Sequence, residues 1–340
     1  VRVRHLNFFV KFAEEIGPLL CGREQRLAFA QVEEEAVNVR FAVEASSDLS
    51  GQAQKGLQIM SALARFVEVR GLFKETRELF AKLLAHPDAG ERNMVRAKAL
   101  AAAARLAWVS DDLEAGMKLE TEALAVFREL GDREGLIDVL GDMSLYLWDA
   151  GDMPGAKRAL DEAESLLATG ENARLRADLL GARSVLAAVE GRHEESLALN
   201  EESLRLYREL GDGWNAAILQ WAIGVTAALL GRIEQAREHF RSNLQSAQEL
   251  GTTWGLPFSL EAFAALAVAE NQFERAARLL GAAEALREKA GLNTAPADHP
   301  ALREILGTAA EHFTQQDLLA ARRAARGMSA AEALSYAMDG

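Results

Sequence analysis

The sequence predicts an all-α protein, an α-α superhelix (solenoid) of about six helix hairpins of 40 residues each. Three observations predict this fold class. The chain of 340 residues is dominated by Ala, Leu, Glu and Arg and contains six prolines, a composition that favours helices throughout. One phrase recurs at multiples of 40, as "VFRELGD" at 126–132, "LYRELGD" at 206–212 and "SAQELGT" at 246–252. Two columns of small residues repeat with the same period.

Each hairpin is predicted to turn at a residue that closes a helix in the left-handed conformation. The six turn positions are spaced by 40: Gly71, Asp111, Gly151, Gly191, Gly231 and Asn271. We expect the first helix of each hairpin, helix A, to end at this position. The second, helix B, then runs to about twenty residues past it, with apolar residues at helical spacing.

The two small columns predict where helices A and B cross closely, because larger side chains would hold the two backbones apart. Seven residues before the turns come Ala64, Ala104, Ser144, Ser184, Gly224 and Ala264. Five residues after the turns come Thr76, Gly116, Ala156, Ser196, Ala236 and Ala276.

The recurring phrase is interpreted as the joint between one hairpin and the next. Gly211 suits the end of helix B, and Asp212 suits the N-cap of the following helix A. Gly90 and Gly170 fall one residue early on this spacing, and Gly291 falls on it. The predicted domains are a helical linker or cap at 1–56 with a hairpin at about 4–46, six repeats at 57–296, and a C-terminal helical cap at 297–340 whose helical segment follows Pro300.

Charge and composition exclude several classes of protein. The net charge of −13 and the lack of a basic stripe argue against nucleic-acid binding by this segment. The short basic stretch at 320–327 is interpreted as part of a surface helix. No apolar run of about 18 residues predicts a membrane span. The single cysteine, Cys21, cannot form an internal disulfide and fits a reducing cytoplasm. The missing initiator Met suggests a fragment of a longer protein.

No motif predicts catalysis, a cofactor or a metal. The six histidines do not show metal-ligand spacing, and His193 occupies a packing column. A phosphate-binding loop of the G-x-x-x-x-G-K-[ST] type does not occur, and no nucleophile lies in a recognisable pattern with a base. The sequence therefore predicts a protein that is not an enzyme.

The hairpin with its small columns resembles the tetratricopeptide repeat, whose usual length is about 34 residues. In that family, positions 2, 5, 9 and 12 of helix A line a concave groove. The resemblance therefore implies a groove that binds a protein, a peptide or a small-molecule effector. The candidate groove residues are Arg65, Arg105, Trp108, Asp138, Leu145, Trp148, Asp178 and Trp221.

Our hypothesis for this groove is a single pocket walled by the three tryptophans. Arg65 and Arg105 form its polar end and attract an anionic group, while Gly141 and Gly181 leave space in the middle. The alternative is that tight superhelical curvature packs these residues against one another as core.

The flanks resemble the region that joins the ATPase module of bacterial STAND-type ATPase regulators, LuxR-type and related, to their helical repeats. The matching stretches are "RHLNFFVKFAEEIGPLLCGREQ" at 4–25, "VEEEAVNVRFAVEAS" at 32–46 and the tail "GMSAAEALSYAM" at 327–338. The residues that carry the match are Arg4, His5, Phe8, Phe9, Ala13, Glu14, Gly22, Gln25, Glu33, Glu35, Asn38, Arg40 and Ala42.

This resemblance implies the sensor half of a transcriptional or signalling regulator, with an ATPase module as its partner in the intact protein. The alternative is an autonomous tetratricopeptide adaptor or scaffold. An ATPase with a phosphate-binding loop encoded upstream of Val1 would favour the first reading.

Overall fold

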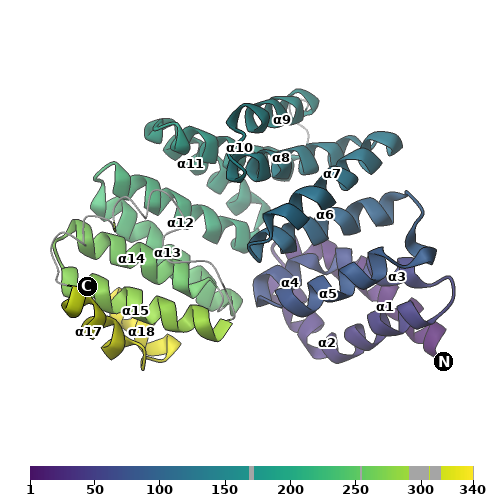
Figure 1. Cartoon of the computed structure of the whole chain (residues 1–340), viewed down its shortest axis with the longest axis horizontal. Helices are drawn as coiled ribbons and strands as arrows, with labels where there is room; N and C mark the ends of the chain where they lie inside the picture. Colours follow the sequence, from purple (N-terminus) through teal and green to yellow (C-terminus); the bar gives the residue numbers. More distant parts are fainter. Residues whose placement is uncertain (168–171, 253–254, 291–305, 307–314, 340) are drawn as a thin grey trace. The chain divides into compact units, whose positions relative to one another are not determined.

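The computed structural model describes residues 1–167, 172–252, 255–290, 306 and 315–339 (Figure 1). Regular secondary structure in these ranges is helical only. Gly170, Gly291 and Pro300 lie outside the described residues. Among the described helices, none combines the length and the apolar character needed to cross a bilayer.

The chain divides into two compact units. The first contains residues 1–182 and 206–213, and the second contains residues 183–205 and 214–340. Helices α10 (Ala173–Val189) and α11 (His193–Leu210) contribute residues to both units.

The first unit begins with the N-terminal hairpin and continues through the first three repeats (Figure 1). The N-terminal hairpin is α1 (Arg2–Ile16), η1 (Gly17–Cys21) and α2 (Gln25–Asp48). The repeats are α3 (Ala53–Ala62) with α4 (Ala64–Arg70) and α5 (Phe73–Leu84), then η2 (Pro87–Ala89), α6 (Met94–Val109) with α7 (Leu113–Leu130), and α8 (Arg133–Asp149) with α9 (Met153–Leu166).

The second unit contains repeats five and six and two further helices. Its repeats are α12 (Gly213–Leu229) with α13 (Ile233–Leu250), and α14 (Leu256–Ala269) with α15 (Phe273–Ala290). Helices α17 (Gln315–Ala325) and α18 (Ala330–Met338) pack against α15, and α18 also meets α14. Ser329 and Glu332 form a reciprocal capping box that starts α18.

All six predicted turns adopt the predicted conformation. The backbone φ angle at the turn residue ranges from 60° at Asn271 to 85° at Gly151. The next N–H reaches back five residues to close the helix, as from Asp112 to the carbonyl of Ala107 at 3.0 Å. At Asp111 and Asn271, a short polar side chain tolerates the left-handed region that glycine occupies elsewhere. In every hairpin, helix B begins two residues after the turn.

The small columns are buried as predicted, with Thr76 half-buried. In the second repeat, a Cβ added to Gly116 would lie 3.4 Å from the carbonyl oxygen of Ala104, so the two columns meet there. In the fifth repeat, a Cβ on Gly224 would lie 2.4 Å from the ring of Phe240. The absent side chain of Gly224 thus leaves the space that this fully buried ring fills.

Three helices differ from the sequence prediction: two of the helices B are shorter than expected, and the first helix A is broken into two. Helix α5 ends at Leu84 because Pro87 starts a 3₁₀ turn, and α9 ends at Leu166, so neither reaches twenty residues past its turn. Gly90, expected at a joint, has a right-handed φ of −74°. The first helix A is broken at Leu63, next to the point where Gly17 approaches the carbonyl oxygen of Ala62.

The N-terminal hairpin contacts the joint at the end of α11 within the first unit. The amide of Gln25 donates to Asp212 at 3.4 Å, and Arg23 donates to the carbonyl of Glu209 at 3.4 Å. A Cβ on Gly211 would lie 2.3 Å from the side chain of Arg23. This joint therefore needs glycine both for its φ of 76° and for the close approach.

We expect Ala236→Leu to destabilise the protein by about 1–3 kcal/mol, because Ala236 is fully buried in the small column and leucine overpacks that crossing. Denaturant unfolding measures the change. Ala198→Leu, at an exposed position of helix B in repeat four, is the matched control and should leave stability nearly unchanged. Equal stability of Ala236→Leu and the wild type would show that the column does not mark a close crossing.

Candidate functional site

Opposite charges alternate along the helix A positions of the first unit. We call this set the charged ladder; its members are Arg65, Glu68, Arg105, Asp138, Asp142, Arg174 and Asp178. They come from α4, α6, α8 and α10, one helix A from each of four successive repeats. The 40-residue repeat thus brings together side chains that are far apart in the sequence.

Arg105 is the central member of the ladder. Its guanidinium lies 3.3 Å from Asp142, 3.6 Å from Asp138 and 3.4 Å from Glu68. Burial opposes its charge, but the surrounding carboxylates, Asp142 first, raise its pKa well above the ordinary value. Arg105 therefore remains a cation held by carboxylates of both neighbouring repeats.

The fourth repeat continues the ladder. The guanidinium of Arg174 lies 3.3 Å from Asp138 and 3.0 Å from Asp178. The hydroxyl of Tyr207, on α11, donates a hydrogen bond to Asp178. At the other end, Arg65 pairs with Glu68 at 3.1 Å.

The ladder combines access to water with strong desolvation. The side chains of Arg105, Asp138, Asp142, Arg174 and Asp178 keep between 29 and 39 % of their surface exposed. Burial nevertheless raises the pKa of Asp142 to about 7, with Arg105 opposing the shift and Asp138 and Asp178 adding to it. Burial and the charge of Asp138 likewise raise the pKa of Asp178 to about 6. Low-dielectric surroundings of this kind strengthen the field at charged groups that solvent still reaches.

The pKa of Asp138 shifts in the opposite direction. Burial also acts to raise its pKa, but Arg174 and Arg105 flank it and lower the pKa below the ordinary value. The ladder therefore separates the pKa values of its carboxyls. Asp138 stays an anion, while Asp142 and Asp178 titrate closer to neutral pH.

Two polar groups beneath the ladder have no hydrogen-bond partner among the described residues. They are the carboxyl of Glu120, on α7 and 0 % exposed, and the hydroxyl of Tyr146, on α8 and 1 % exposed. Burial, and next the charge of Asp142, raise the pKa of Glu120 well above its ordinary value. Asp142 also raises the pKa of Tyr146, after the larger effect of burial. Both groups thus lie within the field of Asp142.

The structure brings together the four charged candidates from the sequence, Arg65, Arg105, Asp138 and Asp178. The ladder partners Asp142, Arg174 and Tyr207 were missed. Local signals could have found the first two, because Asp142 follows Gly141 directly and Arg174 precedes Asp178 by one helical turn.

The predicted aromatic wall divides between the two units. Trp108 is half-buried, stacks edge-on against Tyr146 at 5.5 Å and donates from its indole N–H to Asp149 at 3.0 Å. Trp148 and Leu145 are half-buried in the first unit. Trp221 belongs to the second unit, where its indole N–H donates to the carbonyl of Phe258 at 3.2 Å. The single pocket formed by all three tryptophans remains a hypothesis.

The second unit contains a buried ion pair within repeat six, between Glu261 on α14 and Arg287 on α15. Arg287, 4 % exposed, contacts both carboxylate oxygens of Glu261, 1 % exposed, at 2.6 to 2.8 Å. Its guanidinium also lies 4.4 Å from the ring centre of Phe258. Because the pair lies within one hairpin and is almost fully buried, we interpret it as structural.

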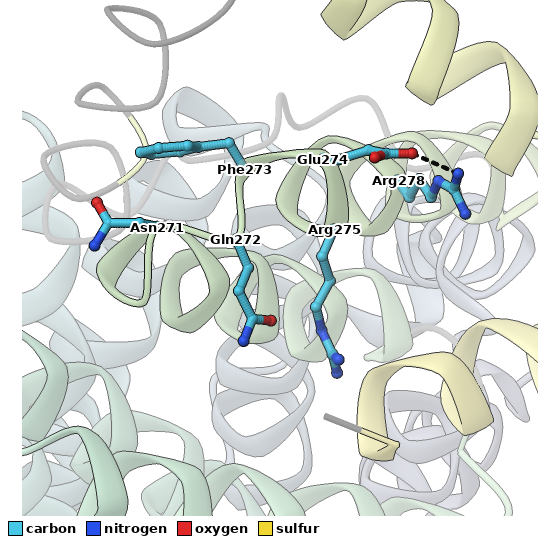
Figure 2. Close-up of a pocket in the computed structure, with 6 residues that line it drawn as sticks. All are labelled: Asn271, Gln272, Phe273, Glu274, Arg275 and Arg278. Carbon is cyan, nitrogen blue, oxygen red and sulfur yellow. Dashed lines mark hydrogen bonds and ion pairs between the residues drawn. The ribbon is translucent and has the colours of Figure 1, made fainter.

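An open hollow lies at the start of α15 (Figure 2). It is lined by Asn271, Gln272, Phe273, Glu274, Arg275 and Arg278, and it contains none of the candidate groove residues. Arg278 pairs with Glu274 at 2.6 Å, and Arg275 donates to the carbonyls of Tyr336 and Ala337 at 3.0 Å each. Since its cations already have partners, this hollow is not the candidate site. No cluster of three or more metal-ligating side chains occurs in the described ranges.

Comparison with solved structures identifies the fold. A Rap protein complexed with Competence and Sporulation Factor matches with a TM-score of 0.70 and 13 % identity, over 94 % of this chain and 85 % of that chain. The APC/C hetero-tetramer Cut9-Hcn1 matches with a TM-score of 0.54 and 12 % identity, over 89 % of this chain and 52 % of that chain. No protein-family model and no curated protein matches the sequence. The chain thus has the tetratricopeptide-like helical-repeat fold.

We expect Arg287→Met to cost about 3–5 kcal/mol of stability, because it leaves the carboxylate of Glu261 buried without its partner. Chemical denaturation measures the loss. The double variant Glu261→Leu, Arg287→Met removes both charges and should recover most of the stability. A double variant as unstable as Arg287→Met would contradict this explanation.

We expect the melting temperature to rise as the pH is lowered from about 8 to about 5. The pKa values of Asp142 and Asp178 are raised in the folded state to about 7 and about 6, so the folded state binds more protons than the unfolded state in this window. This contribution is absent above the folded pKa and is gained as the pH falls through it. Scanning calorimetry across the window should show a smaller slope for Asp142→Asn, while the exposed control Glu15→Gln should keep the wild-type slope.

Proposed function

We propose that the chain is a non-catalytic domain that binds a protein or a peptide on the inner helix A positions of its repeats. The observation that carries this proposal is the charged ladder, which exposes polar side chains from successive repeats to solvent while low-dielectric surroundings strengthen their field. A surface of this kind is suited to an extended partner, because each repeat contributes one contact point.

The two structural relatives add indirect support. Each was determined in an assembly, one as a Rap protein with Competence and Sporulation Factor and the other as the Cut9-Hcn1 hetero-tetramer. By analogy of fold, we propose that this chain also acts through a bound partner, with Arg65, Arg105, Trp108, Asp138, Leu145, Trp148, Asp178 and Trp221 as the contact residues.

We further propose that the domain is the sensor part of a bacterial STAND-type ATPase regulator of transcription or signalling, acting in the cytoplasm. The support is the similarity of 4–25, 32–46 and 327–338 to the flanks of the repeat region in that family. In such a regulator, a ligand shifts the switch only if it binds one state of the repeats better than the other.

Trp148→Ala tests the proposed binding face. Peptides selected from a random dodecapeptide display library against the full chain should bind the variant at least tenfold more weakly, as measured by fluorescence anisotropy. The melting temperature should change little, because the indole of Trp148 is half-buried and donates no hydrogen bond to the described residues.

Trp214→Ala serves as the reference for the loss of stability expected when a core tryptophan is truncated. Trp214 is 6 % exposed, and its truncation should cost about 3–5 kcal/mol. A library that returns no specific binder, or a Trp148→Ala protein as unstable as Trp214→Ala, would refute the proposed binding face.

A further inference from the structure

The arginines of the charged ladder are already neutralised from within the chain. Arg65 pairs with Glu68, and Arg105 lies within 3.6 Å of three carboxylates. Arg174 bridges Asp138 and Asp178. Four carboxylates in the ladder face three guanidiniums. An anionic ligand would have to displace these carboxylates, whereas a cationic ligand adds to the arrangement as it stands. With all four carboxylates ionised, the net charge of the ladder is negative and favours a cation over the anionic group expected from the sequence.

Among the carboxylates of the ladder, Asp142 has the fewest partners within the chain. Its Oδ2 accepts from Arg105 at 3.3 Å, and the described residues offer no other hydrogen bond to its side chain. Since 29 % of the side chain is exposed, a ligand can approach the remaining oxygen. Asp178, by contrast, is already bonded to Arg174 and Tyr207, but it remains 33 % exposed.

A glycine leaves space beside Asp178, and a second glycine lies where α8 and α10 pack closely. Gly181 lies three residues after Asp178 on α10, and a Cβ added there would meet nothing within 4 Å. Gly141 precedes Asp142 on α8, and its added Cβ would lie 3.1 Å from the side chain of Leu179. The side chain of Leu179, on α10, therefore packs against α8 next to Asp142, whereas the space beside Gly181, three residues after Asp178 on α10, is open.

A second observation points to a positive ligand at this place. The carboxyl of Glu120 and the hydroxyl of Tyr146 are fully buried and unpartnered within the described chain, and the charge of Asp142 acts on both. A cation at Asp142 would offset the negative charge that acts on both groups and that Arg105 opposes.

We propose that Asp142, Asp178 and the open space beside Gly181 form a subsite for a basic side chain, arginine or lysine, of the bound peptide. This inference rests on the proposed peptide-binding function and specifies its chemistry. A guanidinium matches best, because its planar donors can bond two carboxylates at once.

The test uses the full chain and the same dodecapeptide selection. The enriched peptides should contain arginine or lysine at one shared position. Replacing that arginine by citrulline, which has nearly the same shape without the charge, should weaken binding to the wild type at least tenfold. Peptides that bind equally well with citrulline would overturn the subsite.

Variants of the protein test whether the preference for arginine arises at Asp142, Asp178 and Gly181. Asp142→Asn with Asp178→Asn should lower affinity for the arginine peptide to that for the citrulline peptide, and should leave the citrulline peptide unaffected. Gly181→Leu should weaken binding of the arginine peptide, because the leucine side chain occupies the open space. It should not lower the melting temperature, because leucine is a better helix former than glycine and its Cβ meets no neighbour there. Glu15→Gln, an exposed carboxylate on α1, is the charge control and should change neither affinity.

The two proposals fail in different ways. If no peptide binds, the peptide-binding function itself is wrong. If peptides bind and lose affinity in Trp148→Ala but show no preference for arginine and no response to Asp142→Asn, the function stands and the subsite is wrong.

Discussion

The close approach of helix A to helix B within each hairpin is the constraint on which the rest of the structure depends. It needs a small residue on both helices at the crossing, and these residues are buried in nearly every repeat. Where glycine stands in the column, a neighbour fills the place of its side chain: the backbone of Ala104 beside Gly116, and the ring of Phe240 beside Gly224. Once this face of helix A is fixed against helix B, the charged positions of neighbouring helices A are directed towards one another.

The repeat register could be predicted from the sequence to the residue, because the signals that set it are local. A left-handed turn restricts the residue type, and Asp111 and Asn271 could be recognised beside four glycines since they share the spacing. The break at Leu63 could not be predicted in this way. It lies where Gly17, from a different hairpin, approaches Ala62, and no local pattern reports such a contact.

The sequence predicted several residues of the candidate site, but not which of them form ion pairs. Family positions located Arg105, Asp138 and Asp178, yet their partners are set by the spacing between successive helices A. Tyr207 shows the difficulty well. It lies in the phrase that marks the joint, where the equivalent residues are Phe127 and Ala247, and its hydroxyl gains a role only because Asp178 is within reach. Charged residues on a helix face are usually solvated, and only the folded neighbours turn this set into a partly desolvated network.

The contact between the N-terminal hairpin and the joint after α11 has a consequence for cooperativity. In an open solenoid each repeat touches only its neighbours, so repeats can unfold one after another. Here Gln25 and Asp212 are 187 residues apart in sequence and meet as buried side chains within one unit, with Arg23 beside Gly211. Such long-range contacts raise the contact order and slow folding. They also connect the N-terminal hairpin to the joint that follows repeat four. We therefore expect loss of this hairpin to destabilise that joint, and the first unit to unfold cooperatively.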